Sequence, residues 1–422
     1  MATTLLQSDL QHQTQSLMAQ VYPGAGAWFN SAANTLFSGL IHGGDTLVNR
    51  LAAFVNETQT SPKGLCERIS GWLNNFDFAT PAAAWLLARN APRVLADTTI
   101  AVDLSDISKP WGGKGMEGMS MGRDGSRGTL AMGHTFCAAV AVAPARQHVF
   151  PLAFAFEMGR KGENKRLRDT LRATHEATAA KGFYALDRGA DSEGTLAFLQ
   201  TLAVRAVVRV KYLTRDVFGT GRAIDAQLDD EPRVDTRLFK PNGSVCAKVS
   251  WRVGHLGGPH DAPVLLVRSE FDGRALYLYA LPGKEGAKAL EEGAKDFAAN
   301  ARHLALTAAQ AYLDRWQVET FFERVKQDFS LENARVRTFK RLKNLFYLCV
   351  LGYSFLTDVL PSSPAHTRMV KVFKDNLHRV TFRTRAFLSG LRVLLAQPRL
   401  NFITGRPRRR VFTPDDQLLL TL

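Results

Sequence analysis

Two aspartates in distant parts of the chain each lie near the end of a short apolar run. Asp103 follows the run that begins at Thr99, and Asp187 follows the run that begins at Phe183. Runs of this length and composition are typical of buried strands. Because an α/β sheet presents the residues at the carboxyl ends of its strands along one edge, we expect Asp103 and Asp187 to lie close together.

A third acid lies in a segment that is expected to be helical. Tyr312, Arg315, Glu319 and Lys326 are separated by three, four and seven residues. On a helix these spacings project all four side chains from one face. The face then carries a phenol, a guanidinium, a carboxylate and an ammonium group, and Glu319 is the candidate that completes a site with the two aspartates.

Three carboxylates from separate segments favour metal-dependent chemistry on phosphodiesters. Carboxylate oxygens are hard ligands that suit Mg²⁺ or Mn²⁺. Two such ions about 4 Å apart can activate a water or a 3′-hydroxyl and stabilise the leaving oxygen. Arg315 and Lys326 could then grip phosphates beside the ions, and Tyr312 could hydrogen-bond a phosphate or stack on a base.

Each predicted ligand has a neighbouring acid that could replace it. Asp106 lies three residues after the first ligand and remains a rival for its role. Asp191 stands where the next helix needs an N-cap, which is the commoner use of such a residue. Glu323 lies one turn beyond the third ligand and suits an ordinary surface ion pair.

The aromatic residues on the same predicted helix are expected to be structural. Trp316, Phe321 and Phe322 lie between and beside the polar positions of the face. Large aromatic side chains are commonly buried. We therefore expect all three to pack in the core and to hold the helix against the sheet.

The spacing Tyr, two residues, Arg, three residues, Glu, six residues, Lys resembles the Tyr-Arg-Glu-Lys (YREK) signature of bacterial insertion-sequence transposases of the DDE type. The four residues of the helix face fit this signature without a gap. The run Asp187–Ser192 is similar to the second-aspartate motif of that family, and the strand that carries Asp103 is similar to the first. The resemblance covers roughly residues 98–344.

The resemblance implies a ribonuclease H-like fold and a DNA transposase. Such an enzyme excises an element by hydrolysis and hairpin formation, and inserts it by strand transfer. It implies that Asp103, Asp187 and Glu319 are the catalytic residues and hold two Mg²⁺ or Mn²⁺ ions. The predicted DNA contacts are Tyr312, Arg315, Lys326 and Arg188. The implied partners are double-stranded DNA, as terminal inverted repeats and target, and a second copy of the chain in a homodimer on paired ends.

The elements that must position these residues form an α/β fold. Residues 1–95 favour short helices and are predicted to be a DNA-end-binding domain. Residues 96–345 follow the order of three strands, helix, strand, helix, strand, which predicts one central sheet and a ribonuclease H-like catalytic core. An inserted β subdomain is expected at about 211–281. Residues 346–422 are predicted to form a basic helical region for DNA contact or dimerisation.

The charge balance also points to a polyanionic partner. The chain has 54 lysines and arginines against 39 acids, a formal net charge of +15. The basic cluster Arg406–Arg410 is either a solvated tail or a phosphate clamp. No apolar run is long enough for a membrane helix, so we expect a cytoplasmic, DNA-associated protein with no membrane partner. Two alternatives remain open, another ribonuclease H-like nuclease or resolvase, and a non-catalytic DNA-binding regulator derived from a transposase.

Overall fold

The computed structural model describes residues 2–55, 60–109, 115–123, 128–143, 148–159, 162–215, 219, 221–241, 243–256, 263–291, 297–367 and 369–370. For residues 2–7, 123, 289–291, 297 and 298 it describes the backbone alone. The basic cluster Arg406–Arg410 and most of the predicted C-terminal region lie outside these ranges.

The described residues among the first ninety form five helices. They are α1 (Ala2–Val21), α2 (Ala27–Gly43), α3 (Val48–Ala53), α4 (Pro62–Asn75) and α5 (Ala79–Asn90). Helix α4 is capped by Ser61, whose hydroxyl accepts from the Gly64 amide at 3.2 Å. Pro81 lies third in α5, within the first turn, where its missing N–H costs no hydrogen bond.

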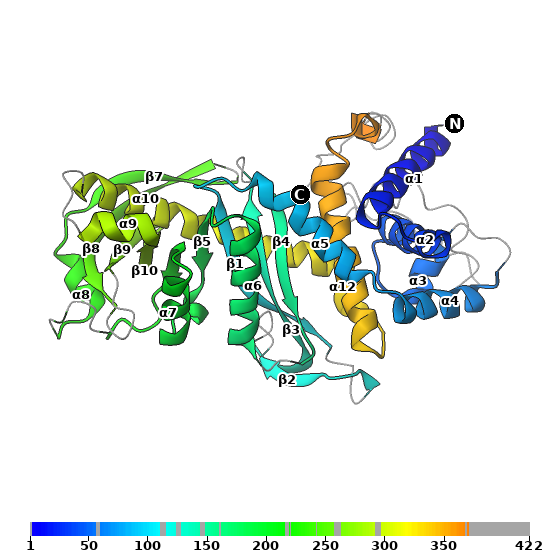
Figure 1. Ribbon diagram of the computed structural model, residues 1–422, viewed down its shortest axis with the longest axis horizontal. Coiled ribbons are helices and arrows are strands. Elements are labelled where there is room, and N and C mark those ends of the chain that lie inside the picture. The colour runs from blue at the N-terminus through cyan, green and yellow to red at the C-terminus, as the bar shows by residue number, and fades with distance from the viewer. Residues whose placement is uncertain are drawn as a thin grey trace.

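The core of the sheet has parallel strands at its centre and antiparallel strands beside them. Its members are β1 (Thr99–Ser108), β2 (Ser120–Arg123), β3 (Leu130–Val142), β4 (Val149–Phe156), β5 (Phe183–Leu186) and β6 (Arg205–Arg209). Strands β1, β5 and β6 are parallel neighbours, while β3 runs antiparallel to β1 and pairs with β4. Helices α6 (Glu163–Ala177) and α7 (Glu193–Thr201) connect β4 to β5 and β5 to β6 (Figure 1). The expected α/β order is confirmed, with β2 as a short addition.

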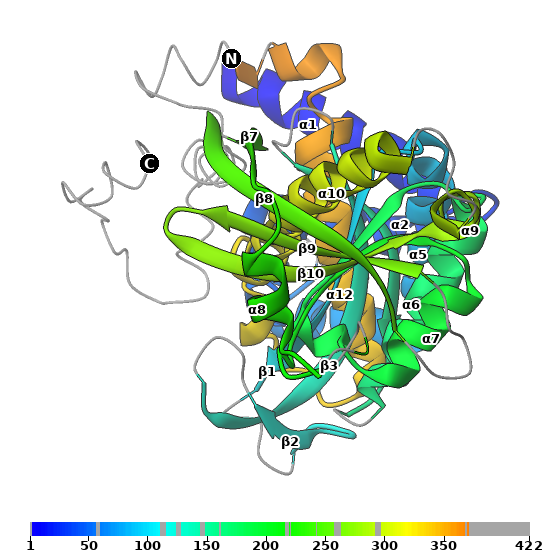
Figure 2. The ribbon, with the colours of Figure 1, turned by 90° about the vertical axis from the view of Figure 1, so that its left-hand side faces the viewer.

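The predicted β insertion does not form a sheet of its own. It contains α8 (Ile224–Asp229), β7 (Val234–Lys240), β8 (Gly243–His255), β9 (Pro263–Phe271) and β10 (Arg274–Pro282). Strand β10 pairs antiparallel with β6, with Leu278 opposite Arg209, so the strands continue the central sheet in the order β6-β10-β9-β8-β7. The physical reason is that β6 would otherwise leave a row of backbone donors and acceptors unpaired. Figure 2 shows these outer strands twisting away from the direction of β1 and β3.

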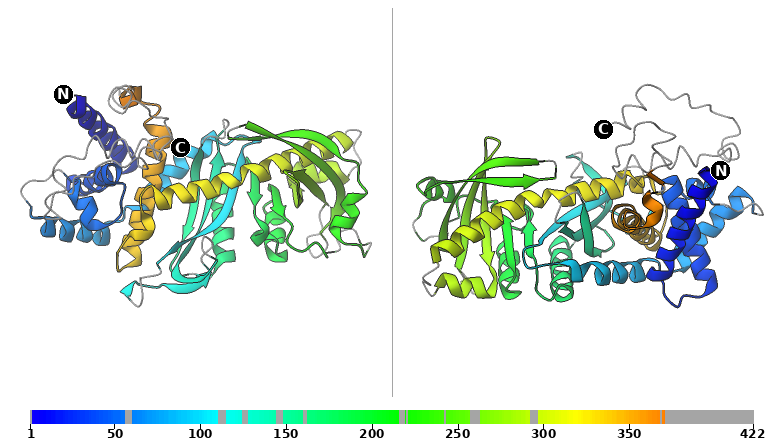
Figure 3. Two further views of the ribbon diagram at one scale, coloured as in Figure 1. Left: turned by 180° about the vertical axis from the view of Figure 1, so that it is seen from behind. Right: turned by 90° about the horizontal axis from the view of Figure 1, so that it is seen from above.

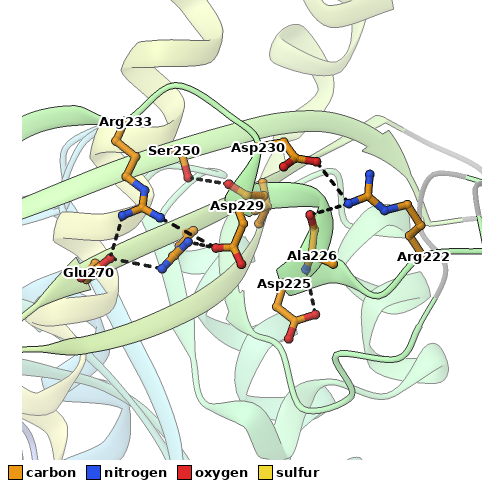
Figure 4. Close-up of polar contacts among 10 residues, drawn as sticks. Arg222, Asp225, Ala226, Asp229, Asp230, Arg233, Ser250 and Glu270 are labelled. Carbon is orange, nitrogen blue, oxygen red and sulfur yellow. Dashed lines mark hydrogen bonds and ion pairs between the residues drawn. The ribbon is translucent and has the colours of Figure 1, made fainter.

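Ion pairs attach α8 to the insertion strands. The Arg233 guanidinium lies 3.6 Å from a carboxylate oxygen of Glu270 on β9 and 3.9 Å from one of Asp229 at the end of α8 (Figure 4). Arg268 on β9 pairs with the same two acids. These contacts hold the helix on the strands at the far end of the sheet.

Helices α10 (Phe297–Asp314), α11 (Trp316–Gln327) and α12 (Phe339–Ser354) cover the face of the sheet opposite α6 and α7. A shorter helix, α9 (Gly283–Glu291), precedes them in the chain. Figure 3 shows α10 and α11 in one line across the strands. Helix α12 packs between the sheet and the N-terminal helices, and one hydrophobic cluster joins all three. Among the described residues, no helix has both the length and the apolar character needed to cross a membrane.

Candidate active site

The register of the sheet places the two predicted aspartates at equivalent positions on adjacent strands. The parallel pairing of β1 with β5 ends where Val102 lies opposite Leu186. The next residue along the chain is the aspartate in both cases: Asp103 within β1, and Asp187 directly after the end of β5 with an extended backbone. Adjacent strands lie roughly 4.8 Å apart, so the backbones at these two positions are neighbours. Strand β1 continues to Ser108, so Asp103 lies mid-strand, at the point where its neighbour β5 stops.

Side-chain alternation directs both aspartates toward the helices that carry the polar residues. Val102 and Leu186 belong to the hydrophobic cluster beneath α6 and α7. Successive side chains of a strand point to opposite faces, so Asp103 and Asp187 point to the face covered by α10 and α11. Because the paired residues of β1 and β5 are in register, both aspartates lie on the same face of the sheet, the one covered by α10 and α11.

Arg315 links Asp103 to Glu319. It lies at the junction of α10 and α11, where its amide still donates to the Ala311 carbonyl at 3.0 Å and keeps the helical path. Its Nη1 donates to Oδ2 of Asp103 at 2.9 Å, and its Nη2 donates to Oε1 of Glu319 at 2.8 Å. The Arg315 side chain is only 4% exposed. The guanidinium therefore occupies the space between these two predicted ligands.

Asp187 is held by different partners on the same helix and on β6. The Tyr312 hydroxyl donates to Oδ1 of Asp187 at 3.0 Å. Nη1 of Arg209, the last residue of β6, lies 4.0 Å from the same oxygen. One turn of helix, from Tyr312 to Arg315, thus contacts both aspartates. Arg209 was missed by the sequence reasoning, although a basic residue at the carboxyl end of the next parallel strand is the signal that could have found it.

The electrostatics show that the three carboxylates influence one another. Burial raises the pKa of Asp103 to about 6; Arg315 opposes this rise, while Asp187 and Glu319 add to it by repulsion. Burial alone would lower the pKa of Arg315, but its acidic neighbours, Asp103 foremost, raise it overall. Burial raises the pKa of Tyr312 to about 12, so its hydroxyl stays protonated and can donate to Asp187.

The donor types fit a divalent ion, but their present arrangement holds an arginine instead. Within the described part of the chain, no three His, Cys, Asp or Glu side chains are grouped closely enough to hold a metal ion. The positive charge between Asp103 and Glu319 comes from Arg315. Three carboxylate oxygens are suitable ligands for Mg²⁺ or Mn²⁺. A metal ion would therefore have to replace the guanidinium.

The neighbouring acids are engaged elsewhere. Asp106 accepts from the Ser108 hydroxyl at 2.5 Å, and Nζ of Lys326 lies 3.6 Å from its carboxylate. Lys326 therefore faces the rival acid rather than the three predicted ligands. Glu323 is exposed, as expected of a surface acid.

The N-cap prediction for Asp191 is wrong. Ser192 caps α7 by accepting from the Thr195 amide. The buried Asp191 carboxylate instead accepts from the Lys211 amide at 2.7 Å and from Arg215 at 2.6 Å. A sequence pattern gives only the approximate start of a helix, so it could not choose between adjacent polar residues.

The predicted burial of Trp316 is also wrong. Its side chain is 49% exposed, whereas Phe321 and Phe322 are buried as expected. Trp316 directly follows Arg315 and opens α11, on the side of the helix turned away from the sheet core. Arg188 is exposed as well, in the short turn that follows Asp187. An exposed indole and an exposed guanidinium therefore lie close in sequence to the carboxylates.

Comparison with known proteins identifies the family. The family model of the transposase DDE domain matches residues 98–355, more than half of the 422-residue chain. The chain belongs to the DDE transposase family. No curated protein matches it. The matched transposase domain begins one residue before β1, ends one residue after α12, and contains all three predicted ligands. Membership supports a transposase function and a DNA substrate.

The raised pKa of Asp103 predicts a pH-dependent stability of the metal-free transposase. The folded state holds the Asp103 proton more tightly than the unfolded chain, because the pKa rises from 3.8 to about 6 on folding. This stabilising contribution is complete below about pH 4 and is lost as the pH rises through the folded-state pKa. We expect Asp103→Asn to flatten the fall of the melting temperature between pH 4 and pH 8, because the variant lacks this titrating group. Thermal unfolding between pH 4 and pH 8 measures this, and an identical pH profile in the variant would contradict it.

Proposed function

We propose that this transposase is a bacterial insertion-sequence enzyme of the Tyr-Arg-Glu-Lys group that uses two Mg²⁺ or Mn²⁺ ions. The observation that carries the proposal is the register of β1 and β5, which places Asp103 beside Asp187 on the face that Glu319 approaches. The strand order β4-β3-β1-β5-β6, with three parallel strands, supports a ribonuclease H-like core.

Asp103, Asp187 and Glu319 are the proposed ligands. Bound ions would activate a water or 3′-hydroxyl and stabilise the leaving oxygen of a phosphodiester. Two side chains of the protein would orient these carboxylates and balance their negative charge before a metal ion binds. Tyr312 orients the Asp187 carboxylate through its hydroxyl hydrogen bond. Arg315 neutralises the other two acids until metal ions take over that function.

Arg315 would then be free to contact DNA. A guanidinium released from carboxylates can bind a phosphate through two parallel hydrogen bonds. Lys326, Arg188 and Arg209 are further candidates for phosphate contact, since each lies on an element that also carries a proposed ligand or adjoins one. The exposed Trp316 could stack on a base unpaired at the element end, where hairpin formation requires a distorted terminus.

We propose that the regions outside the family match bind the ends of the element and join two copies of the protein. Helices α1–α5 lie outside the family match and would bind the terminal repeats. The basic region after α12 would contact DNA or a second copy, in a homodimer on paired ends. The formal charge of +15 suits this extensive contact with phosphates.

Incubation with DNA that carries the inverted repeats flanking its gene, a target plasmid and Mg²⁺ tests the proposed function. We expect cleavage at the repeat ends and covalent joining of those ends to the plasmid. Cleavage without joining would instead indicate a ribonuclease H-like nuclease or resolvase. Binding to the repeats without cleavage would indicate a non-catalytic regulator, and both results would contradict the proposal.

A further inference from the structure

The edge strand of the insertion is attached to the helix that carries Tyr312 and Arg315. Strand β7 ends the sheet and runs beside α10 (Figure 1). The Gln310 amide binds both backbone groups of Phe239 on β7: its Oε1 accepts from the Phe239 amide at 2.7 Å, and its Nε2 donates to the Phe239 carbonyl at 2.9 Å. A side-chain amide thus takes the place of the next strand's peptide group.

A second polar residue continues this attachment to the strand that carries Asp103. Nε2 of Gln310 also donates to Oδ1 of Asp314 at 2.9 Å, one turn further along α10. Oδ2 of Asp314 accepts from the hydroxyl of Thr99, the first residue of β1, at 3.3 Å. Asp314 is only 5% exposed. The hydrogen bonds therefore form a continuous chain from β7 of the insertion, through the side chains of Gln310 and Asp314 on α10, to strand β1.

The buried face of α10 gives a reason why such an attachment is needed. In the hydrophobic cluster that α10 forms with the sheet, the helix contributes five alanines, at 301, 305, 308, 309 and 311, and three larger residues, Leu304, Tyr312 and Leu313. Alanine allows a helix to lie close to a sheet, but a methyl group interlocks little with its neighbours. The alanine positions therefore add little resistance to rotation of α10, and directional hydrogen bonds supplement the packing of the three larger residues.

We propose that Gln310 and Asp314 are positioning residues that fix the rotation of α10, and that the β7–β8 hairpin is the clasp that holds them. On a helix Tyr312 lies about 200° from Gln310, and Arg315 about 100° from Asp314. The clasp thus holds one side of the helix while Tyr312 and Arg315 engage the aspartates on another. Anchored on both sides, the helix cannot rotate without breaking one set of hydrogen bonds.

The substitution Gln310→Met tests the clasp, since it keeps the length of the side chain and removes its hydrogen bonds. We expect faster hydrogen–deuterium exchange of the amides of residues 308–320. We also expect a single-turnover rate constant for DNA cleavage reduced roughly ten- to a hundred-fold, because small displacements of positioned groups have effects of this size. Saturating enzyme and a temperature well below unfolding make this rate constant independent of the folded fraction.

Gln227→Met is the matched control. Gln227 is buried within the insertion and donates to the Arg222 carbonyl at 2.7 Å, so its loss should lower stability without altering exchange or rate at α10. Thr99→Val and Thr99→Ser repeat the test at the other end of the chain of bonds; only the valine variant should resemble Gln310→Met.

The activity part of this inference rests on the proposed function, and the exchange part does not. Unchanged exchange at residues 308–320 in both Gln310→Met and Thr99→Val would overturn the clasp. An unchanged cleavage rate in an active protein would overturn the positioning role. A wild-type protein that does not cleave DNA would instead contradict the proposed function, while the exchange measurement would still decide on the clasp.

Discussion

Replacing Asp187 by alanine is expected to abolish metal-dependent cleavage of the element ends while the protein stays folded. The Asp187 side chain is 33% exposed, and it contacts the Tyr312 hydroxyl and, at the longer distance of 4.0 Å, the Arg209 guanidinium. Loss of one such hydrogen bond costs about 1 kcal/mol of stability. Loss of a metal ligand removes several kcal/mol of transition-state stabilisation, which corresponds to a rate reduced by about 10³-fold or more.

The variant Asp191→Ala is the matched control, because it removes a neighbouring carboxylate that is not a proposed metal ligand. Asp191 lies four residues away, is buried, and pairs with Arg215. Its removal leaves the Lys211 amide and the half-buried Arg215 guanidinium without that partner, and should lower the melting temperature more than Asp187→Ala does. Its single-turnover cleavage rate should stay near that of the wild type. An Asp187→Ala protein that cleaves within tenfold of the wild-type rate would remove this residue from the metal site.

Replacing Arg315 by glutamine is expected to strengthen metal binding in the absence of DNA. Arg315 occupies oxygens of Asp103 and Glu319, so a metal ion must displace a buried cation from both. Two like charges 4 Å apart repel by up to about 4 kcal/mol at an effective dielectric constant of 20. Removing the arginine should therefore tighten Mn²⁺ binding by about tenfold or more. Electron paramagnetic resonance of free Mn²⁺ during titration gives the affinity directly.

The same substitution should weaken cleavage, since the released guanidinium is the proposed phosphate contact. Arg209→Gln is the control, because it removes an equal charge 4.0 Å from Asp187 without a bridge between two ligands. Its effect on Mn²⁺ affinity should be smaller. An Arg315→Gln protein that binds Mn²⁺ no more tightly than the wild type would show that the arginine does not compete with the metal.

Local sequence was sufficient to find the strands and the polar helix face. The runs before Asp103 and Asp187 form β1 and β5, and Tyr312, Arg315 and Glu319 lie on successive turns that face them. Apolar runs and helical spacing depend on residues close in sequence, so they can be predicted without knowledge of the fold.

Properties that depend on tertiary pairing could not be predicted in this way. The insertion strands were expected to form a subdomain, but β10 pairs with β6 and extends the central sheet. Trp316 was expected in the core, but its side chain is about half exposed. The bridge from Arg315 to two carboxylates also depends on which groups meet across the fold, and sequence spacing does not supply that information.

The most direct measurement of the central claim is a crystal structure of the protein bound to its terminal-repeat DNA in Mn²⁺, with the ions located by anomalous scattering. We expect two peaks within coordination distance of the carboxylates of Asp103, Asp187 and Glu319, with Arg315 turned to a phosphate. Peaks elsewhere, or an Arg315 guanidinium still bound to Asp103 and Glu319 with no ion between them, would contradict a metal site built from these three acids.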